Sequence, residues 1–95
     1  MYSFSDLKFS PRSGGVISRI SFPNGYSASV VCGPYTYGGQ EGLYEVAVLH
    51  SGMIVYDTPV TSDVLGHLTQ DDVTRILNEI AVLPPRRAAS TPPSN

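Results

Sequence analysis

The stretch FPNGYSASVV, residues 22–31, decides how the sheet of this chain is built. Apolar and polar side chains alternate along residues 16–22 and again along 26–32, which is the period-two pattern of β-strands. Between them, residues 23–25 read Pro-Asn-Gly, in which proline fixes φ and Asn-Gly tolerates the positive φ of a tight turn. The sequence therefore predicts an antiparallel hairpin whose register is set by this turn. One face of the predicted hairpin carries Val16, Ser18, Ile20, Phe22, Tyr26, Ala28, Val30 and Cys32.

A second hairpin is predicted after a long loop. Residues 33–42, GPYTYGGQEG, contain four of the nine glycines, one proline and two tyrosines, a composition that does not favour a regular element. Residues 43–50, LYEVAVLH, are apolar on both faces near their middle, so we expect them to form a central strand. Ser-Gly at 51–52 is a second tight turn, and residues 53–57, MIVYD, are expected to pair back as a fourth strand.

The pattern changes to a helical period in the last third of the chain. DVLGHL, residues 63–68, is expected to form a short helical turn capped by Thr61 or Ser62. Thr69 followed by Asp72 resembles a capping box, which marks the start of the last helix. The apolar face of this helix carries Val73, Ile76, Leu77, Ile80 and Leu83, and two prolines end it.

These elements together predict an α+β fold, with a four-stranded antiparallel sheet made of two hairpins and packed by a C-terminal amphipathic helix. We expect residues 1–15 to be an N-terminal extension and residues 16–83 to form a single α+β domain. Residues 84–95 are rich in proline and serine without apolar content, so we expect a disordered tail.

Composition and charge narrow the classes of function. The formal net charge is −2, and six Lys and Arg residues are too few for a general nucleic-acid binder. A single cysteine, Cys32, excludes an internal disulfide framework, and no stretch reads as a signal peptide or a membrane span. Seven of the eight acidic residues lie between positions 41 and 79, which leaves open an acidic face beside ordinary solvated charges. We therefore expect a soluble protein of the cytoplasm, with no direct nucleic-acid or membrane partner.

No residue pattern indicates catalysis, a metal site or a cofactor. A base or metal role for His50 or His67 would require a partner such as Asp57, and both histidines have ordinary surface neighbours in the sequence. Cys32 shares a nominal face with apolar residues, so a buried, unreactive thiol is expected. The loop at 33–42 lacks the Lys-Ser/Thr ending of a phosphate-binding loop. We expect a protein that is not an enzyme.

The tyrosines are the best candidates for a binding role. The chain has six tyrosines and no tryptophan, and Tyr35 and Tyr37 lie in the loop where the core has least need of them. Tyrosine supplies a large contact area at low entropic cost, as protein interfaces require. An equally weighted alternative is that these rings fold back as lids over the sheet. The predicted protein-binding residues are Tyr35, Tyr37, Glu41, Asp57 and Asp63.

Three segments, FPNGYSASVV, YTYGGQEGLYEVAVL and YDTPVTSDVLGHLTQDDV, carry a resemblance to known sequences. With patterns of the types F-x-N-G-Y-x-A-S-V and Y-D-T-P-[IV]-T-x-D-V-x-G-x-L, residues 16–83 resemble a group of small accessory proteins of tailed bacteriophages and prophages. The resemblance implies action in the cytoplasm of the bacterial host and carries over no functional residues. Compact proteins of this class bind and block host proteins, so it implies an inhibitor of a host defence component, such as an anti-CRISPR that occupies a basic groove of a CRISPR-Cas effector subunit.

Two alternatives remain open at the level of sequence. The loop at 33–42 could close over a small ligand or nucleotide, which would make the chain a ligand-binding protein. The edge strands could instead pair between copies, which would make it a homodimer or a homo-oligomeric structural component of the phage.

Overall fold

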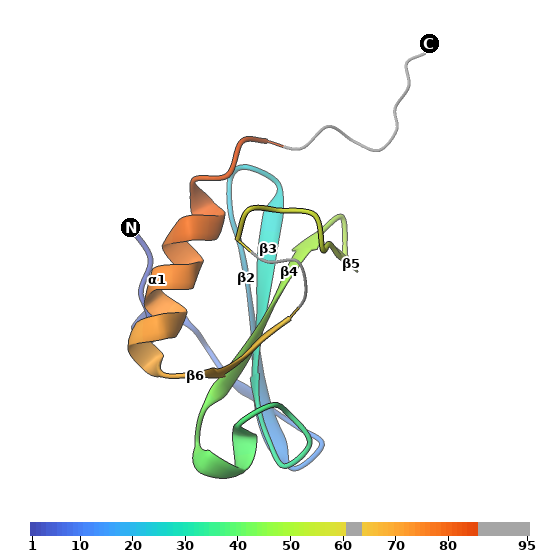
Figure 1. Cartoon of the computed structure of the whole chain (residues 1–95), viewed down its shortest axis with the longest axis vertical. Helices are drawn as coiled ribbons and strands as arrows, with labels where there is room; N and C mark the ends of the chain where they lie inside the picture. The colour runs from blue at the N-terminus through green and yellow to red at the C-terminus, as the bar shows by residue number, and fades with distance from the viewer. Residues whose placement is uncertain (61–63, 86–95) are drawn as a thin grey trace.

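A computed structural model describes residues 1–60 and 64–85. It is an antiparallel sheet with one face covered by a C-terminal helix, so the predicted α+β class is confirmed (Figure 1). The strands follow the order β1-β2-β3-β4-β5. The strand β6 pairs with the first part of β4, on the same edge whose last residues pair with β5. The elements are β1 (Ser10–Arg12), β2 (Gly15–Ser21), β3 (Tyr26–Cys32), β4 (Tyr44–His50), β5 (Met53–Ile54), β6 (Leu65–Leu68), α1 (Gln70–Ala81) and two 3₁₀ turns, η1 (Phe4–Asp6) and η2 (Gly39–Glu41).

The first hairpin and the helix follow the sequence pattern. β2 pairs with β3, and β3 with β4, in an unbroken register that places Ala28 between Ile20 and Val48. Side chains of alternate residues point toward α1 and form the core with the apolar face of the helix. The side chains with almost no exposed surface are Ala28, Val30, Val46, Val48, Val73, Ile76, Leu77 and Ile80.

The sheet has six strands rather than the four predicted. The additional β1 lies within residues 1–15, which the sequence predicts to be an extension, because a three-residue strand that contains proline is too short to show a period. The segment expected to be a short helix instead contains β6, which pairs with β4 through Val46–Leu65 and Tyr44–Leu68. His67 has a φ of 57°, which is incompatible with a right-handed helix. The expected caps, Thr61 and Ser62, lie outside the described residues, as do residues 86–95 of the tail.

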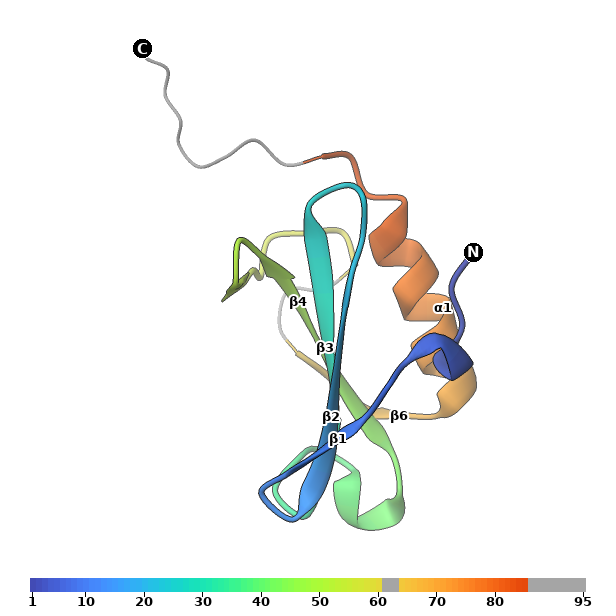
Figure 2. The ribbon, with the colours of Figure 1, turned by 180° about the vertical axis from the view of Figure 1, so that it is seen from behind.

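The first nine residues pack against the helix. Figure 2 shows this segment running from α1 to the start of β1. The Asn78 side chain accepts a hydrogen bond from the Tyr2 N–H (2.9 Å) and donates one to the Tyr2 carbonyl (2.8 Å), while Thr74 accepts one from the Phe4 N–H. The rings of Phe4, Phe9 and Tyr44 meet with centroids 4.9 to 5.8 Å apart. Residues that were expected to be an extension therefore contribute to the sheet and to its core.

Both ends of α1 are capped. At the N-terminus, the Asp72 N–H donates to Thr69 Oγ1 (3.1 Å) and the Thr69 N–H donates to Asp72 Oδ2 (3.0 Å), which completes the predicted capping box. The bond from the Thr69 backbone, with smaller contributions from the Thr69 side chain and Arg75, lowers the pKa of Asp72.

The C-terminus of α1 is held by the first hairpin. The Asn24 side-chain amide lies 2.8, 3.3 and 3.0 Å from the carbonyl oxygens of Ile80, Ala81 and Leu83, and its own oxygen accepts from the Tyr26 N–H. The Asn-Gly turn thus reverses the chain and also supplies a side-chain donor to the carbonyls of the last helical residues and of Leu83 just after them.

One buried polar group stands out in the core. The Ser18 hydroxyl, on the helix-facing side of β2, is buried and has no hydrogen-bond partner among the described residues. A buried hydroxyl without a partner has lost its hydrogen bonds to water and has gained none in the protein, which lowers the free energy of unfolding.

We therefore expect Ser18→Ala to leave the free energy of unfolding unchanged or to raise it by up to about 1 kcal/mol. Urea denaturation of the wild type and the variant measures this difference. A loss of more than about 1 kcal/mol would show that the hydroxyl has a partner in solution.

Candidate functional site

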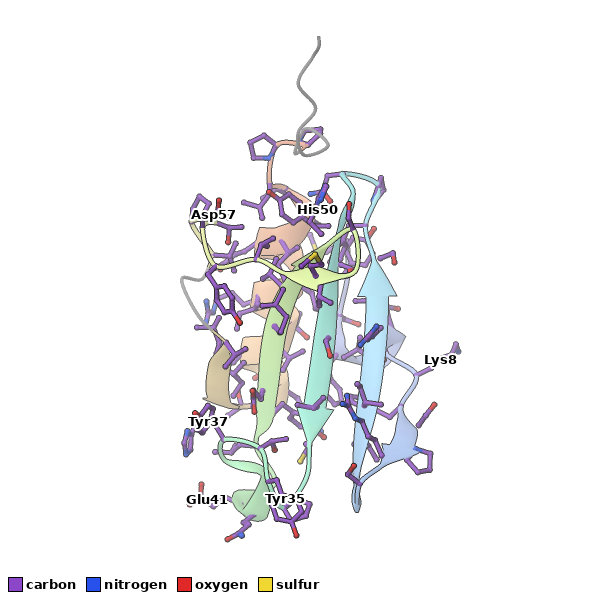
Figure 3. The ribbon with its side chains drawn as sticks, turned by 90° about the vertical axis from the view of Figure 1, so that its right-hand side faces the viewer. Lys8, Tyr35, Tyr37, Glu41, His50 and Asp57 are labelled. Atoms are coloured by element: carbon purple, nitrogen blue, oxygen red, sulfur yellow. The ribbon has the colours of Figure 1, made fainter. Side chains whose placement is uncertain are left out.

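Three of the five predicted binding residues lie together. Figure 3 places Tyr35, Tyr37 and Glu41 at one end of the sheet and Asp57 at the opposite end. Asp57 therefore does not share a surface with the tyrosines, and Asp63 lies outside the described residues. We call the surface made by Tyr35, Tyr37, Glu41 and His67 the tyrosine tip.

Both loop tyrosines point into solvent. Tyr35 is 91% exposed and Tyr37 is 63% exposed, and neither belongs to the hydrophobic core. The alternative in which these rings fold back as lids over the sheet is therefore wrong.

The loop that carries the tyrosines is braced by its own hydrogen bonds. Thr36 Oγ1 accepts from the Gly33 N–H and donates to the Gly33 carbonyl, both at 3.0 Å. The Thr36 carbonyl in turn accepts from the Gly39 N–H at 3.1 Å. A Cβ at Gly39 would overlap the Gly33 carbonyl, so this crossing of the loop over itself requires glycine. The backbone beneath the exposed rings is thus fixed in place.

Tyr37 is further tied to the sheet on both sides. Its N–H donates to Glu45 Oε1 on β4 (3.1 Å), and its carbonyl accepts from the His67 N–H on β6 (3.1 Å). Gly66 allows this approach, because a Cβ there would overlap the Cβ of Tyr37. The two strands therefore hold the loop at a defined height above the end of the sheet.

His67 is the member of the tip that sequence reasoning missed. Its Nε2 lies 3.9 Å from Glu41 Oε1, and both side chains are mostly exposed. The contact depends on β6 being a strand and on the left-handed backbone at His67, neither of which is visible in the sequence pattern. Exposed pairs of this kind add little stability, so the pair mainly defines the charge pattern of the tip.

Two shallow hollows lie at the tyrosine tip, and Pro34, Tyr35 and Thr36 line both of them. The larger, of about 360 Å³, extends toward Arg12, Cys32 and Glu45. The smaller, of about 310 Å³, extends toward Tyr37, Gly38, Gln40, Glu41 and His67. The exposed ring of Tyr35 and the two hollows that it lines offer a partner both a protruding group and recesses for its side chains.

Other reactive side chains are accounted for by local contacts. The Cys32 Sγ lies 3.9 Å from the Gly39 carbonyl and is half-buried rather than fully buried as expected. His50 packs its ring edge-on against Tyr26 and contacts Ser51 Oγ through Nδ1. Within residues 1–60 and 64–85, no three His, Cys, Asp or Glu side chains gather as metal ligands would. In the same residues, no helix is long and apolar enough to cross a membrane.

Comparison with known proteins adds no information on function. No family model, curated protein or solved structure matches the chain. The geometry of the tyrosine tip is therefore the basis for the function proposed for this protein.

Proposed function

We propose that this protein is a binding protein that inhibits a host protein by occluding its surface, and that the tyrosine tip is the recognition element. The observation that carries the proposal is the exposure of Tyr35 and Tyr37 on a backbone that is already fixed. Exposed aromatic rings cost free energy in water, and a rigid loop loses little conformational entropy on binding. Both properties are typical of residues that dominate protein interfaces.

The tip also suits a partner with positive charge. Glu41 lies at its outer side, and the loop from residue 33 to 42 contains no Lys or Arg. Carboxylates beside an aromatic anchor speed the encounter with a basic groove and help to exclude acidic partners. The resemblance to phage accessory proteins supplies the context: a partner in the bacterial cytoplasm, with a CRISPR-Cas effector subunit as the proposed class.

Replacing both tyrosines separates binding from folding. We expect the Tyr35→Ala/Tyr37→Ala variant to lose at least tenfold in affinity, which corresponds to about 1.4 kcal/mol, while its melting temperature stays close to that of the wild type. Affinity capture from lysate of the bacterial host identifies the partner, and titration of the purified partner measures the dissociation constant.

Tyr56→Ala is the matched control. Tyr56 is also exposed, at 52%, but it is next to Asp57 at the other end of the molecule. The control variant should bind as the wild type does. Full binding by the double tyrosine variant, or equal losses in the control, would rule out the tip as the recognition element.

A second candidate function is the binding of a small ligand in the larger hollow. Its volume of about 360 Å³ falls in the range of small-molecule sites, and Arg12 and Glu45 place opposite charges on its lining. A ligand that raises the melting temperature of the wild type but not of an Arg12→Ala variant would favour this function.

A further inference from the structure

The strand β2 leaves part of its outer edge unpaired. The Phe22 N–H donates to the Tyr26 carbonyl at 2.9 Å, and the register of β2 on β3 is regular from there to the other end of the hairpin. In an antiparallel ladder only alternate residues bond to a given neighbour. The even-numbered residues of β2 therefore bond to β3, and the odd-numbered residues direct their N–H and C=O groups to the outer side.

β1 covers only the first part of that outer side. Its pairing with β2 ends at Ser10 opposite Ile17, where the chain turns away toward the helix. In the described part of the chain, no backbone hydrogen bond joins Lys8 or any other residue to the outer groups of Arg19 and Ser21. These two exposed residues thus present two amides and two carbonyls with the spacing of a β-ladder.

The outer edge of β1, in contrast, cannot readily pair with a further strand. Pro11 stands opposite Val16, a residue of β2 that bonds to β3, so the backbone of Pro11 faces outward. Proline has no N–H, and an outward proline is a common device that blocks further pairing at an edge. An added strand would therefore pair with β2 at Arg19 and Ser21 and not with β1.

This side of the sheet is basic, although the chain as a whole is acidic. Lys8, Arg12 and Arg19 are exposed, and the sequence between Asp6 and Glu41 contains no acidic residue. Figure 3 shows Lys8 extending past β2 on the side away from β3. A strand that docks at Arg19 and Ser21 meets the positive charges of Lys8 and Arg19, whereas Arg12 lies opposite Gly15 at the other end of β2 and lines the larger hollow together with Glu45.

We propose that the edge of β2 at Arg19 and Ser21 binds an acidic, extended segment of a partner protein as an additional strand of the sheet. This surface is separate from the tyrosine tip and goes beyond the proposed function. Backbone groups at ladder spacing select an extended peptide, and the cations select an acidic one. A second copy of this chain fits less well, because β2 edges paired about a twofold axis would bring the same positive charges together.

Amide exchange read residue by residue by NMR tests the proposal directly. The probes are two short peptides, one alternating glutamate with valine and one alternating lysine with valine. In the free protein we expect fast exchange at Arg19 and Ser21 and slow exchange at Ile20, whose N–H bonds to β3. The glutamate peptide should slow exchange at Arg19 and Ser21 by at least tenfold and leave Ile20 unchanged, and the lysine peptide should have no effect.

A charge-reversal pair provides the control. Arg19→Glu should weaken binding of the glutamate peptide at least tenfold, whereas Arg75→Glu, the same change on the exposed side of α1, should leave it within twofold. The proposal is overturned if neither peptide slows exchange at millimolar concentration, if both bind equally, or if protection appears elsewhere. It is also overturned if the free protein elutes as a dimer with both amides already protected, or if a single-stranded oligonucleotide protects them better than the glutamate peptide does.

Discussion

Replacing Ile80 by alanine is expected to lower the free energy of unfolding by about 2–5 kcal/mol. Ile80 has no exposed surface and lies on the face of α1 that packs against the sheet, where Ile76 and Leu77 are equally buried. Truncation removes the transfer free energy of the lost methyl and methylene groups and leaves a cavity, because neighbours on a six-stranded sheet relax only partly. A loss of this size is a large fraction of the stability of a small domain.

Val82→Ala is the matched control for this prediction. Val82 is 80% exposed just after α1, so its truncation should change stability by less than about 0.5 kcal/mol. Chemical denaturation of both variants at equal protein concentration gives the two values. A loss at Ile80 no greater than that at Val82 would show that α1 does not pack on the sheet as described.

Replacing Asn24 by aspartate is expected to cost about 2–4 kcal/mol, from lost hydrogen bonds and an unfavourable charge at the helix terminus. The amide group of Asn24 donates to the carbonyls of Ile80 and Ala81 at the end of α1 and of Leu83 just after it, and a carboxylate cannot donate. It would also place a negative charge at the negative end of the helix dipole. The bond from the Tyr26 N–H and the geometry of the turn are retained, so the loss isolates the contact with the helix.

The charge component can be separated from the donor component. Asn24→Ala removes the donors without adding a charge and should cost less than Asn24→Asp, about 1–2 kcal/mol. Protonation of the introduced carboxyl restores a donor and removes the charge, so the deficit of Asn24→Asp should narrow as the pH falls below about 4. Equal stability of Asn24→Asp and the wild type at neutral pH would show that the turn does not cap the helix in solution.

The sequence pattern correctly predicted the elements that interactions between residues close in the chain determine. The alternation on both sides of Pro23-Asn24-Gly25 predicted the first hairpin, and Thr69 with Asp72 predicted where the last helix begins. These elements need only nearest neighbours along the chain to specify them. The link from Asn24 to the end of α1 joins residues 56 or more positions apart, and no local pattern could indicate it.

The errors have a common physical origin in long-range pairing. β6 was predicted as a helical turn because its apolar residues are too few to define a period, and its strand conformation depends on β4 beside it and on the Tyr37 carbonyl that accepts from His67. His67 was not predicted as part of the candidate site for the same reason, since its position depends on β6 being a strand. Asp57 was grouped with the tyrosines by charge alone, whereas the path of β4 along the sheet carries it to the other end.

Hydrogen–deuterium exchange on the complex with the captured partner tests the central claim most directly. The account predicts that saturating partner slows exchange in residues 33–42 and at His67, while the amides of α1 and of the loop around Asp57 exchange as they do in the free protein. Protection confined to α1 or to the open face of the sheet, with the tip exchanging as in the free protein, would contradict it.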